Sequence, residues 1–253
     1  MKTLIILHGW QSSGSKWQKV KEKIENSSAS LGRGGIRVLA PDIPGFKSES
    51  ELNRPWVLDD YINWFEDFVM QSKLEYPDIA NGFYLLGHSF GGRMTIKIAA
   101  KKIFKLNGVI LVSAAGIKRN QAFYAPAIGF AAKIVKAFKL GDKPTGKNLY
   151  NFLRIFFYRY VIQKTDYLNA KGNLNETIKN ILAEDLKEIL PFIDERVKII
   201  WGRKDKITPL SDAYLMQEKI PNSELHILEQ TGHMPYLDCP NELAESILEF
   251  IKY

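Results

Sequence analysis

The sequence has a single cysteine, Cys239, among its 253 residues. One cysteine excludes an intrachain disulfide, which fits a reducing compartment. Long apolar runs are also missing, and no stretch approaches the roughly 18 residues of a membrane-spanning helix. The apolar run near the start covers only Leu4 to Leu7, which is shorter than the core of a secretory signal peptide. We therefore expect a cytoplasmic protein.

Acidic residues are nearly absent from one segment, between Ile117 and Thr165. This segment contains ten lysines and arginines and one acid, Asp142, whereas the whole chain carries a formal net charge of +7. Three interpretations are open: a solvated basic surface, attraction of an acidic partner or an anionic membrane surface, and binding of nucleic acid. We do not expect nucleic acid, because the motifs elsewhere in the chain indicate different chemistry.

Short apolar runs alternate with amphipathic stretches over most of the chain, and the sequence contains no internal repeat. This alternation is typical of βα units that build a parallel sheet. The predicted strands are Thr3–Leu7, Arg37–Ala40, Phe83–Leu86, Gly108–Val112, Lys198–Trp201 and Glu224–Leu228. The predicted helices are Ser15–Asn26, Leu58–Ser72, Gly91–Lys101, Leu210–Lys219 and Asn241–Lys252.

The alternation stops between about Gly116 and Asp194, where the pattern predicts helices without strands. Such a long block between two strands exceeds a simple crossover connection. We therefore predict an α/β core formed by residues 1–116 and 195–253, with a helical lid inserted at 117–194. The lid coincides with the basic segment, and its predicted helices are 123–138, 149–163 and 174–190.

A serine between glycines follows the third predicted strand, in the stretch LLGHSFGG (85–92). Residues 87–91 match the pattern G-x-S-x-G, which places a nucleophilic serine on a strained turn between a strand and a helix. The strain requires small residues two positions either side, and Gly87 and Gly91 meet this requirement. The alternative interpretation is that Ser89 only caps the following helix.

A nucleophilic serine needs a histidine base, and the sequence contains four histidines. His88 adjoins Ser89, so its side chain should point away from the serine. His8 ends the first strand, and His226 lies in an apolar strand, where a hydrogen-bonded core histidine is the simpler interpretation. His233 lies in the loop after the last strand, at the carboxyl edge where open α/β sheets place their sites. His233 is therefore the predicted base.

The third member of such a site is an acid that orients the histidine. Asp205 follows a predicted strand and lies in the segment GRKDKITP. The alternative interpretation is that this aspartate is only a turn residue, since aspartate is common in turns. The other position for an acid, after the strand ending at Val112, offers no carboxylate. The chain order Ser89, Asp205, His233 is the order of the α/β hydrolases.

Five short motifs resemble the α/β-hydrolase superfamily over nearly the whole chain. They are HGW (8–10), DIPGF (42–46), GHSFGG (87–92), GRKDKITP (202–209) and TGHMPYLDCPNEL (231–243). The resemblance implies the α/β-hydrolase fold, with a mostly parallel sheet and an inserted α-helical lid. The chain starts at the strand that the family usually counts as its third, so we expect about six strands, with the first two missing.

The resemblance also implies an oxyanion hole made of two backbone N–H groups. By position these groups belong to Trp10 and Phe90, and Phe90 adds the positive end of the helix that it begins. His8 would brace the loop of Trp10 without taking part in catalysis. The sequence HGW, in place of an HGGG-type loop, argues against the lipases that take bulky substrates.

The implied reaction is acyl transfer to water through an acyl-enzyme. We expect a carboxylesterase that cleaves small-molecule esters of short- to medium-chain acyl groups. A serine at position 89 argues against the dehalogenases and epoxide hydrolases of this fold, which use an aspartate nucleophile. No metal or organic cofactor is expected, because His, Cys and carboxylates show no metal-ligand spacing.

Candidates for the lining of an acyl pocket lie in the lid and beside the motifs. Aromatic residues of LYNFLRIFFYRYVIQ recur at helical spacing, and most of them are expected to pack the lid onto the core. The candidate lining residues are Trp10, Phe123, Phe156 and Met234.

Three alternative functions stay open. HGW followed by Trp17, DIPGF and the basic lid resembles carboxylesterases that act on methyl esters of acyl chains tethered to acyl carrier protein, a strongly acidic partner. A carbon–carbon bond hydrolase of the same fold would share the triad and the lid. A non-enzymatic binding protein on this scaffold would escape covalent labelling by a fluorophosphonate.

Overall fold

The computed structural model describes residues 1–29, 35–46, 51–118 and 172–252. Contacts between residues divide the chain into one compact unit, formed by residues 1–117 and 172–253, and a second unit of residues 118–171. The predicted lid helices at 123–138 and 149–163, with Phe123 and Phe156, lie outside the described residues.

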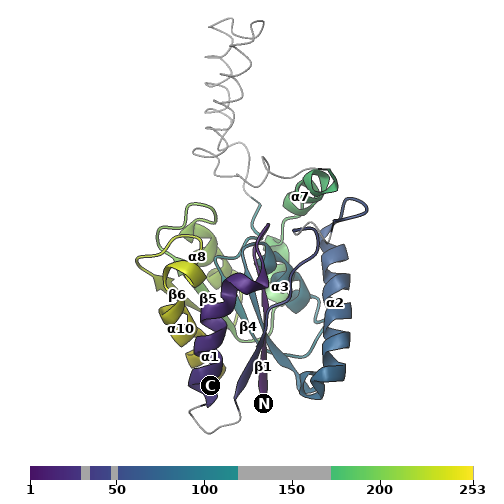
Figure 1. Cartoon of the computed structure of the whole chain (residues 1–253). Coiled ribbons are helices and arrows are strands. Elements are labelled where there is room, and N and C mark those ends of the chain that lie inside the picture. The colour runs from purple at the N-terminus through teal and green to yellow at the C-terminus, as the bar shows by residue number, and fades with distance from the viewer. Residues whose placement is uncertain (30–34, 47–50, 119–171, 253) are drawn as a thin grey trace, which may run out of the picture. The chain divides into compact units, whose positions relative to one another are not determined.

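Six parallel strands form one sheet in the order β2-β1-β3-β4-β5-β6 (Figure 1). They are β1 (Lys2–Leu7), β2 (Ile36–Leu39), β3 (Phe83–His88), β4 (Leu106–Val112), β5 (Val197–Gly202) and β6 (Ser223–Leu228). Each strand lies where an apolar run predicts one, and no boundary moves by more than two residues. The sheet is parallel throughout, so the predicted fold class is confirmed.

Side chains of the strands alternate between two apolar cores, one on each face of the sheet. In β1, Leu4 and Ile6 belong to one core, whereas Ile5 and Leu7 belong to the other. Both faces are covered, so these strands are apolar at nearly every position instead of alternating apolar and polar residues.

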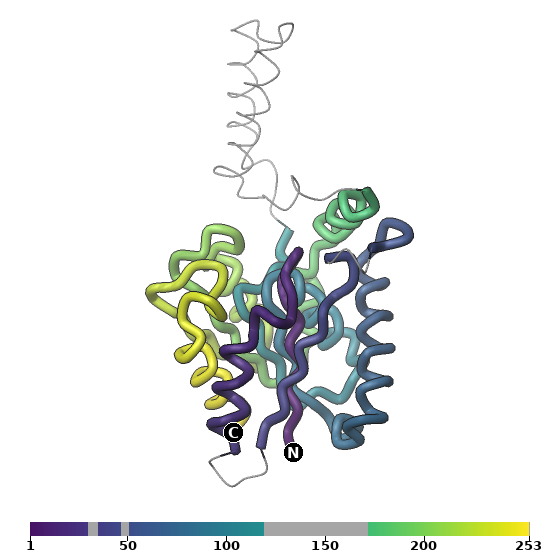
Figure 2. The backbone as a smooth tube through the Cα atoms, in the orientation of Figure 1, coloured from purple at the N-terminus to yellow at the C-terminus, as the bar shows by residue number. Residues whose placement is uncertain are grey.

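Helices cover the two faces of the sheet and form the outer layers (Figures 1 and 2). One face carries α1 (Gln18–Ala29) and α10 (Pro240–Lys252), which pack against each other. The other face carries α2 (Leu58–Glu75), α3 (Phe90–Ala100) and α8 (Leu210–Lys219). The shorter elements are η1 (Gly14–Trp17), η3 (Pro77–Asn81), α7 (Asn173–Ala183), η7 (Lys187–Phe192) and α9 (Pro235–Asp238).

The described part of the predicted lid, residues 172–194, packs with the sheet. The Trp56 N–H donates to Thr177 Oγ1 (2.9 Å), and this bond docks α7 on the segment before α2. Nearly buried Lys97 of α3 forms an ion pair with Glu184, just after α7 (2.7 Å). These contacts place residues 172–194 in the same compact unit as the sheet, and the lid as a separate body stays a prediction.

The strand order reverses next to β1. From β1, β2 lies on one side, whereas β3 and all later strands lie on the other side. Open α/β sheets bind their ligands at the carboxyl ends of the strands beside such a reversal. The segments that follow β1 and β3 carry Trp10 and Ser89, so the fold brings both predicted site residues to this point.

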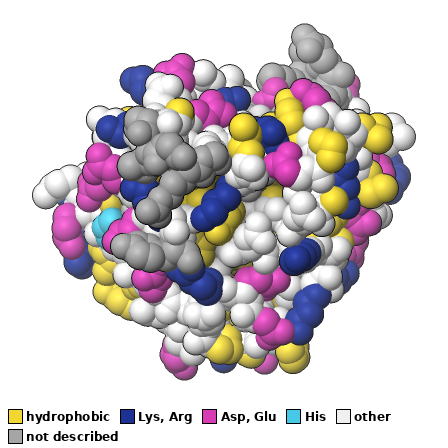
Figure 3. Space-filling view, turned by 90° about the horizontal axis from the view of Figure 1, so that it is seen from below, with side chains coloured by type: hydrophobic (Ala, Val, Ile, Leu, Met, Phe, Trp, Pro, Cys, Tyr) yellow, Lys and Arg dark blue, Asp and Glu magenta, His cyan; other side chains and the backbone are white. Residues whose placement is uncertain are grey.

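The opposite face of the unit, at the amino ends of the strands, carries interspersed charges of both signs (Figure 3). The two ends of the described chain meet there, where Lys2 Nζ donates to the carbonyl of Ile251 (2.5 Å). Across the described ranges, no helix is long and apolar enough to cross a membrane.

Candidate active site

Ser89 stands between β3 and α3 in a strained backbone conformation. Its φ of 51° and ψ of −112° are a combination that non-glycine residues rarely adopt. Ser89 occupies the N-cap position of α3, but its hydroxyl makes no capping hydrogen bond. The alternative interpretation, that the Ser89 side chain caps this helix, is therefore not supported by the geometry.

Gly87 and Gly91 are required by close approaches of the backbone around Ser89. A Cβ on Gly91 would lie 2.1 Å from the carbonyl oxygen of Leu7, and a Cβ on Gly87 would lie 2.4 Å from the carbonyl oxygen of Gly91. Both distances are far inside van der Waals contact, and backbone atoms cannot rotate away. The turn is also held by the Ser89 N–H, which donates to the carbonyl of Val112 at the end of β4 (3.2 Å).

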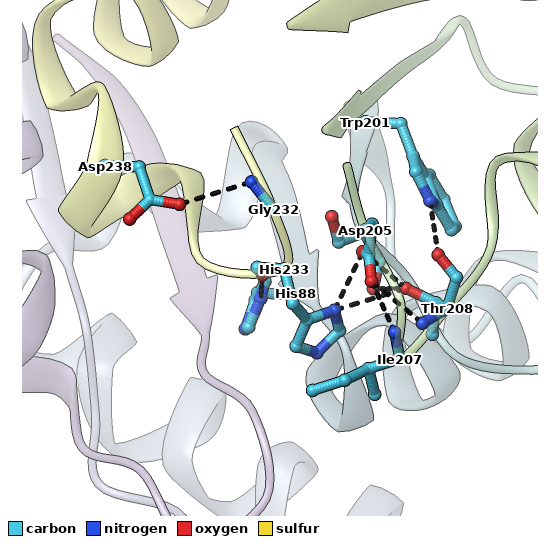
Figure 4. Close-up of polar contacts among 9 residues, drawn as sticks. His88, Trp201, Asp205, Ile207, Thr208, Gly232, His233 and Asp238 are labelled. Carbon is cyan, nitrogen blue, oxygen red and sulfur yellow. Dashed lines mark hydrogen bonds and ion pairs between the residues drawn. The ribbon is translucent and has the colours of Figure 1, made fainter. Parts of the chain in front are cut away.

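Asp205 and His233 meet beyond the carboxyl ends of β5 and β6 (Figure 4). The Lys204 N–H donates to the Thr231 carbonyl (2.9 Å), so the pairing of the two strands extends into their loops. His233 Nδ1 lies 2.8 Å from Asp205 Oδ2. The carboxylate only accepts, so the imidazole donates through Nδ1, and its neutral form keeps a lone pair on Nε2.

The Asp205 carboxylate is buried and accepts four hydrogen bonds. In addition to His233, the N–H groups of Ile207 (2.8 Å) and Thr208 (3.0 Å) bond to Oδ1, and the Thr208 hydroxyl bonds to Oδ2 (2.9 Å). Burial raises the pKa of this carboxyl, but these bonds together outweigh burial and lower the pKa below its ordinary value. Asp205 therefore holds its negative charge next to His233 at neutral pH.

Thr208 is a site residue that the sequence patterns did not single out. Its hydroxyl lies 2.9 Å from Asp205 Oδ2, 3.1 Å from the Ser113 carbonyl and 3.3 Å from His233 Nδ1. Trp201 Nε1 donates to the Thr208 carbonyl (2.8 Å), which anchors the loop to β5 (Figure 4). The sequence did contain a signal, because an aspartate that bonds to N–H groups two and three residues later forms a common turn.

Two other histidines, His8 and His226, have partners away from the Asp205 carboxylate. His8 Nε2 accepts the Ile43 N–H (2.9 Å), and His8 Nδ1 lies 2.9 Å from the Gly9 carbonyl. The bond from the Ile43 N–H links the loop after β2 to the loop after β1. His226 is half-buried in β6 and lies 2.7 Å from Ser246 Oγ.

His88, the fourth histidine, is the last residue of β3 and is buried. Its ring packs against Trp17 and Tyr236, with centroids 5.9 and 5.0 Å away. Its Nε2 lies 2.8 Å from the carbonyl oxygen of His233 (Figure 4). Burial, followed by the nearby His233 ring, lowers the pKa of His88 to about 3, so the imidazole is neutral.

The free energy of unfolding is expected to fall as the pH drops from about 6.5 toward 4.5. The folded pKa of His88, about 3, lies below the ordinary value of 6.5, so the unfolded chain binds a proton that the folded chain does not. A fully buried histidine of this kind costs roughly 1 kcal/mol of stability per pH unit in this window. Denaturant titrations across the window test this, and a His88→Gln variant with an undiminished slope would contradict it.

The residues predicted to supply the oxyanion hole follow β1 and β3. Phe90 is the first residue of α3, so its N–H is one that a helix leaves without an intrahelical acceptor. Trp10 lies in a turn closed by the Ser12 N–H, which donates to the Gly9 carbonyl (3.2 Å). The rings of Trp10 and Phe90 pack edge to face, with centroids 5.4 Å apart. The two residues are therefore neighbours beside Ser89.

Of the predicted lining residues, Trp10 and Met234 lie in the described part of the chain. Met234 directly follows His233 and is 45% exposed. Trp10 is half-buried against Phe46, with ring centroids 4.8 Å apart. In the described ranges, no group of three or more His, Cys, Asp or Glu side chains is placed to hold a metal ion.

Comparison with known families assigns the fold and the sequence motifs to one class. A family model described as the alpha/beta hydrolase fold matches residues 2–240. The chain therefore belongs to the alpha/beta hydrolase family, and the resemblance drawn from the five motifs is confirmed.

Similar proteins include an esterase and hydrolases that are named for dienedioate or meta-cleavage substrates. A 2-hydroxy-6-oxononadienedioate/2-hydroxy-6-oxononatrienedioate hydrolase of Pseudomonas putida is 24% identical over 266 residues, which cover 100% of this chain and 88% of the relative. An esterase from Exiguobacterium antarcticum superimposes with a TM-score of 0.70 at 19% identity, covering 100% of this chain and 92% of the esterase. A meta-cleavage product hydrolase from Pseudomonas fluorescens IP01 gives a TM-score of 0.65 at 18% identity, covering 100% and 91%. The two structural similarities show the shared fold.

Proposed function

We propose that the protein is a serine hydrolase that cleaves carboxylic esters of short- to medium-chain acyl groups. The observation that carries the proposal is the 2.8 Å hydrogen bond from His233 Nδ1 to the buried Asp205 carboxylate, at the sheet edge where Ser89 sits on its strained turn. A histidine oriented by a carboxylate, at the same sheet edge as a serine whose hydroxyl does not cap its helix, is the arrangement that activates a serine nucleophile.

The first step is attack by Ser89 on the ester carbonyl. His233 Nε2 takes the hydroxyl proton as Oγ bonds to the carbonyl carbon, and Asp205 stabilises the imidazolium that forms. In the described chain, no hydrogen bond joins Ser89 Oγ to His233. Contacts of this kind often shorten only when substrate is bound.

This attack forms a tetrahedral intermediate with a negatively charged oxygen, and in the second step the intermediate collapses, breaking the bond to the alcohol oxygen and leaving the acyl-enzyme. The N–H groups of Trp10 and Phe90 are the proposed donors to this oxygen, and the amino end of α3 adds a favourable field. The His233 imidazolium then gives its proton to the leaving alcohol. Hydrolysis of the acyl-enzyme follows by the same route, with His233 taking a proton from the attacking water.

The acyl group is proposed to lie against Trp10 and Met234, the predicted lining residues that fall in the described part of the chain. Phe123 and Phe156 are proposed as further contacts from the lid. Apolar walls of this kind favour acyl chains in proportion to the area that they remove from water, at about 25 cal/mol per Å².

Carbon–carbon bond hydrolysis is the second candidate function. The names of the Pseudomonas putida relative and of the meta-cleavage product hydrolase favour it. The same serine, histidine and aspartate would serve both reactions, so the substrate and not the triad separates the two candidates.

A substrate panel tests the proposed function. Esters of p-nitrophenol with acyl chains from acetate to decanoate are expected to be hydrolysed, with the highest kcat/KM at short to medium length. A vinylogous diketone of the meta-cleavage type should be turned over poorly. Efficient turnover of the diketone with negligible ester hydrolysis would reverse the choice, and absence of labelling at Ser89 by a fluorophosphonate would argue against both enzymes.

A further inference from the structure

The buried imidazole of His88 touches the three loops on which the proposed reaction depends. It adjoins Ser89 in the chain, and its Nε2 lies 2.8 Å from the main-chain carbonyl of His233. On the side of the β1 loop, a Cβ placed on Gly9 would lie only 2.9 Å from His88 Nδ1. One ring therefore lies between the serine loop, the histidine loop and the loop that carries Trp10.

The hydrogen bond to His233 has a fixed direction. A carbonyl oxygen only accepts, so the His88 ring donates through Nε2. In the neutral imidazole Nδ1 then has no proton, and no other atom of the described residues bonds to it. The bond from Nε2 to the His233 carbonyl is therefore the hydrogen bond that the His88 side chain makes to the described residues.

We infer that His88 is a positioning residue: its hydrogen bond to the His233 carbonyl sets where the base stands relative to Ser89. This inference rests on the proposed function, because it concerns the same base and nucleophile. Asp205 holds the His233 ring through Nδ1, whereas His88 holds the His233 main chain. β3 ends at His88, directly before Ser89. The bond therefore fixes the main chain of the base to the strand that carries the nucleophile.

Loss of the bond should affect the rate more than binding. The His233 carbonyl would no longer receive a hydrogen bond from His88. The His233 ring could then shift while keeping its bond to Asp205. A displacement of about 1 Å at a reacting group costs up to roughly a hundredfold in rate. Of the proposed substrate contacts, Trp10 would keep its place, because it packs against Phe46 and Phe90 and not on the His233 loop.

A matched pair of variants tests the inference. Glutamine and methionine have nearly the same length, but only glutamine has an N–H group near the position of Nε2. His88→Met is expected to lower kcat by about ten- to a hundredfold with KM nearly unchanged, whereas His88→Gln should recover most of the rate. Equal losses in both variants, or a loss seen in KM instead of kcat, would overturn the positioning role.

The wild-type protein provides a second measurement that needs neither a variant nor a substrate. Long-range ¹H–¹⁵N spectra distinguish the two neutral tautomers of a histidine, and His88 is expected to carry its proton on Nε2. A proton on Nδ1 would overturn the inference, even if both variants fail to fold. If wild-type protein neither hydrolyses esters nor reacts with a fluorophosphonate, the proposed function fails, and the tautomer still reports whether the hydrogen bond exists.

Discussion

Ser89→Ala is expected to lower ester turnover by about five to six orders of magnitude while the fold is retained. The substitution removes the atom that would form the acyl-enzyme, and only the background rate from the oxyanion hole and from binding is left. Hydrolysis of p-nitrophenyl esters measures the loss, and mass spectrometry after fluorophosphonate treatment should show no adduct on the variant.

Ser113 provides a matched control for this experiment. It follows β4, the strand next to β3, and it also has a positive φ, of 43°. Its hydroxyl is buried and has no hydrogen-bond partner among the described residues. Ser113→Ala is expected to leave ester turnover close to the wild-type rate. Wild-type turnover by a folded Ser89→Ala protein would show that the nucleophile is assigned wrongly.

Gly91→Ala is expected to destabilise the protein by about 3 kcal/mol or more. Its Cβ would lie 2.1 Å from the Leu7 carbonyl oxygen and 2.5 Å from the Leu7 carbonyl carbon, so α3 and β1 would have to separate. Both elements are buried in the core and cannot move without breaking other contacts. Denaturant unfolding should show a lower midpoint, and any residual activity should fall because the serine turn is displaced.

Gly232→Ala is the control for the effect of adding a methyl group near the site. A Cβ on Gly232 would have a nearest neighbour at 3.8 Å, the Lys204 carbonyl oxygen, which is an ordinary contact. The free energy of unfolding of the Gly232→Ala variant is expected to stay within about 1 kcal/mol of the wild-type value. Similar losses for Gly91→Ala and Gly232→Ala would mean that the tight approach of α3 to β1 is not the cause.

The strands were predictable because both faces of the sheet are buried. A run such as Leu4–Leu7 is apolar throughout, and the bounded length of these runs distinguishes them from helices. Proximity of Asp205 and His233 followed from topology, since neighbouring parallel strands end at one edge. The triad roles themselves stay predictions, which the Ser89 and Ser113 variants address.

Contacts between distant parts of the chain were not predictable from local patterns. His88 and the His233 carbonyl are 145 residues apart, and no periodicity relates them. The predicted helix at 174–190 is divided for a similar reason. It ends at Ala183, where Glu184 adopts an extended conformation and its carbonyl accepts a hydrogen bond from Arg93 of α3. A partner on another element therefore decides where that helix stops.

The meeting of the two chain ends at the amino edge of the sheet has a practical consequence. The Lys2–Ile251 contact lies at the opposite end of the strands from Ser89 and His233. A tether attached at either terminus would therefore hold the protein by the end of the strands opposite the proposed reaction centre. Immobilised on a resin or a sensor chip through its ends, the protein should turn over p-nitrophenyl esters as it does in solution.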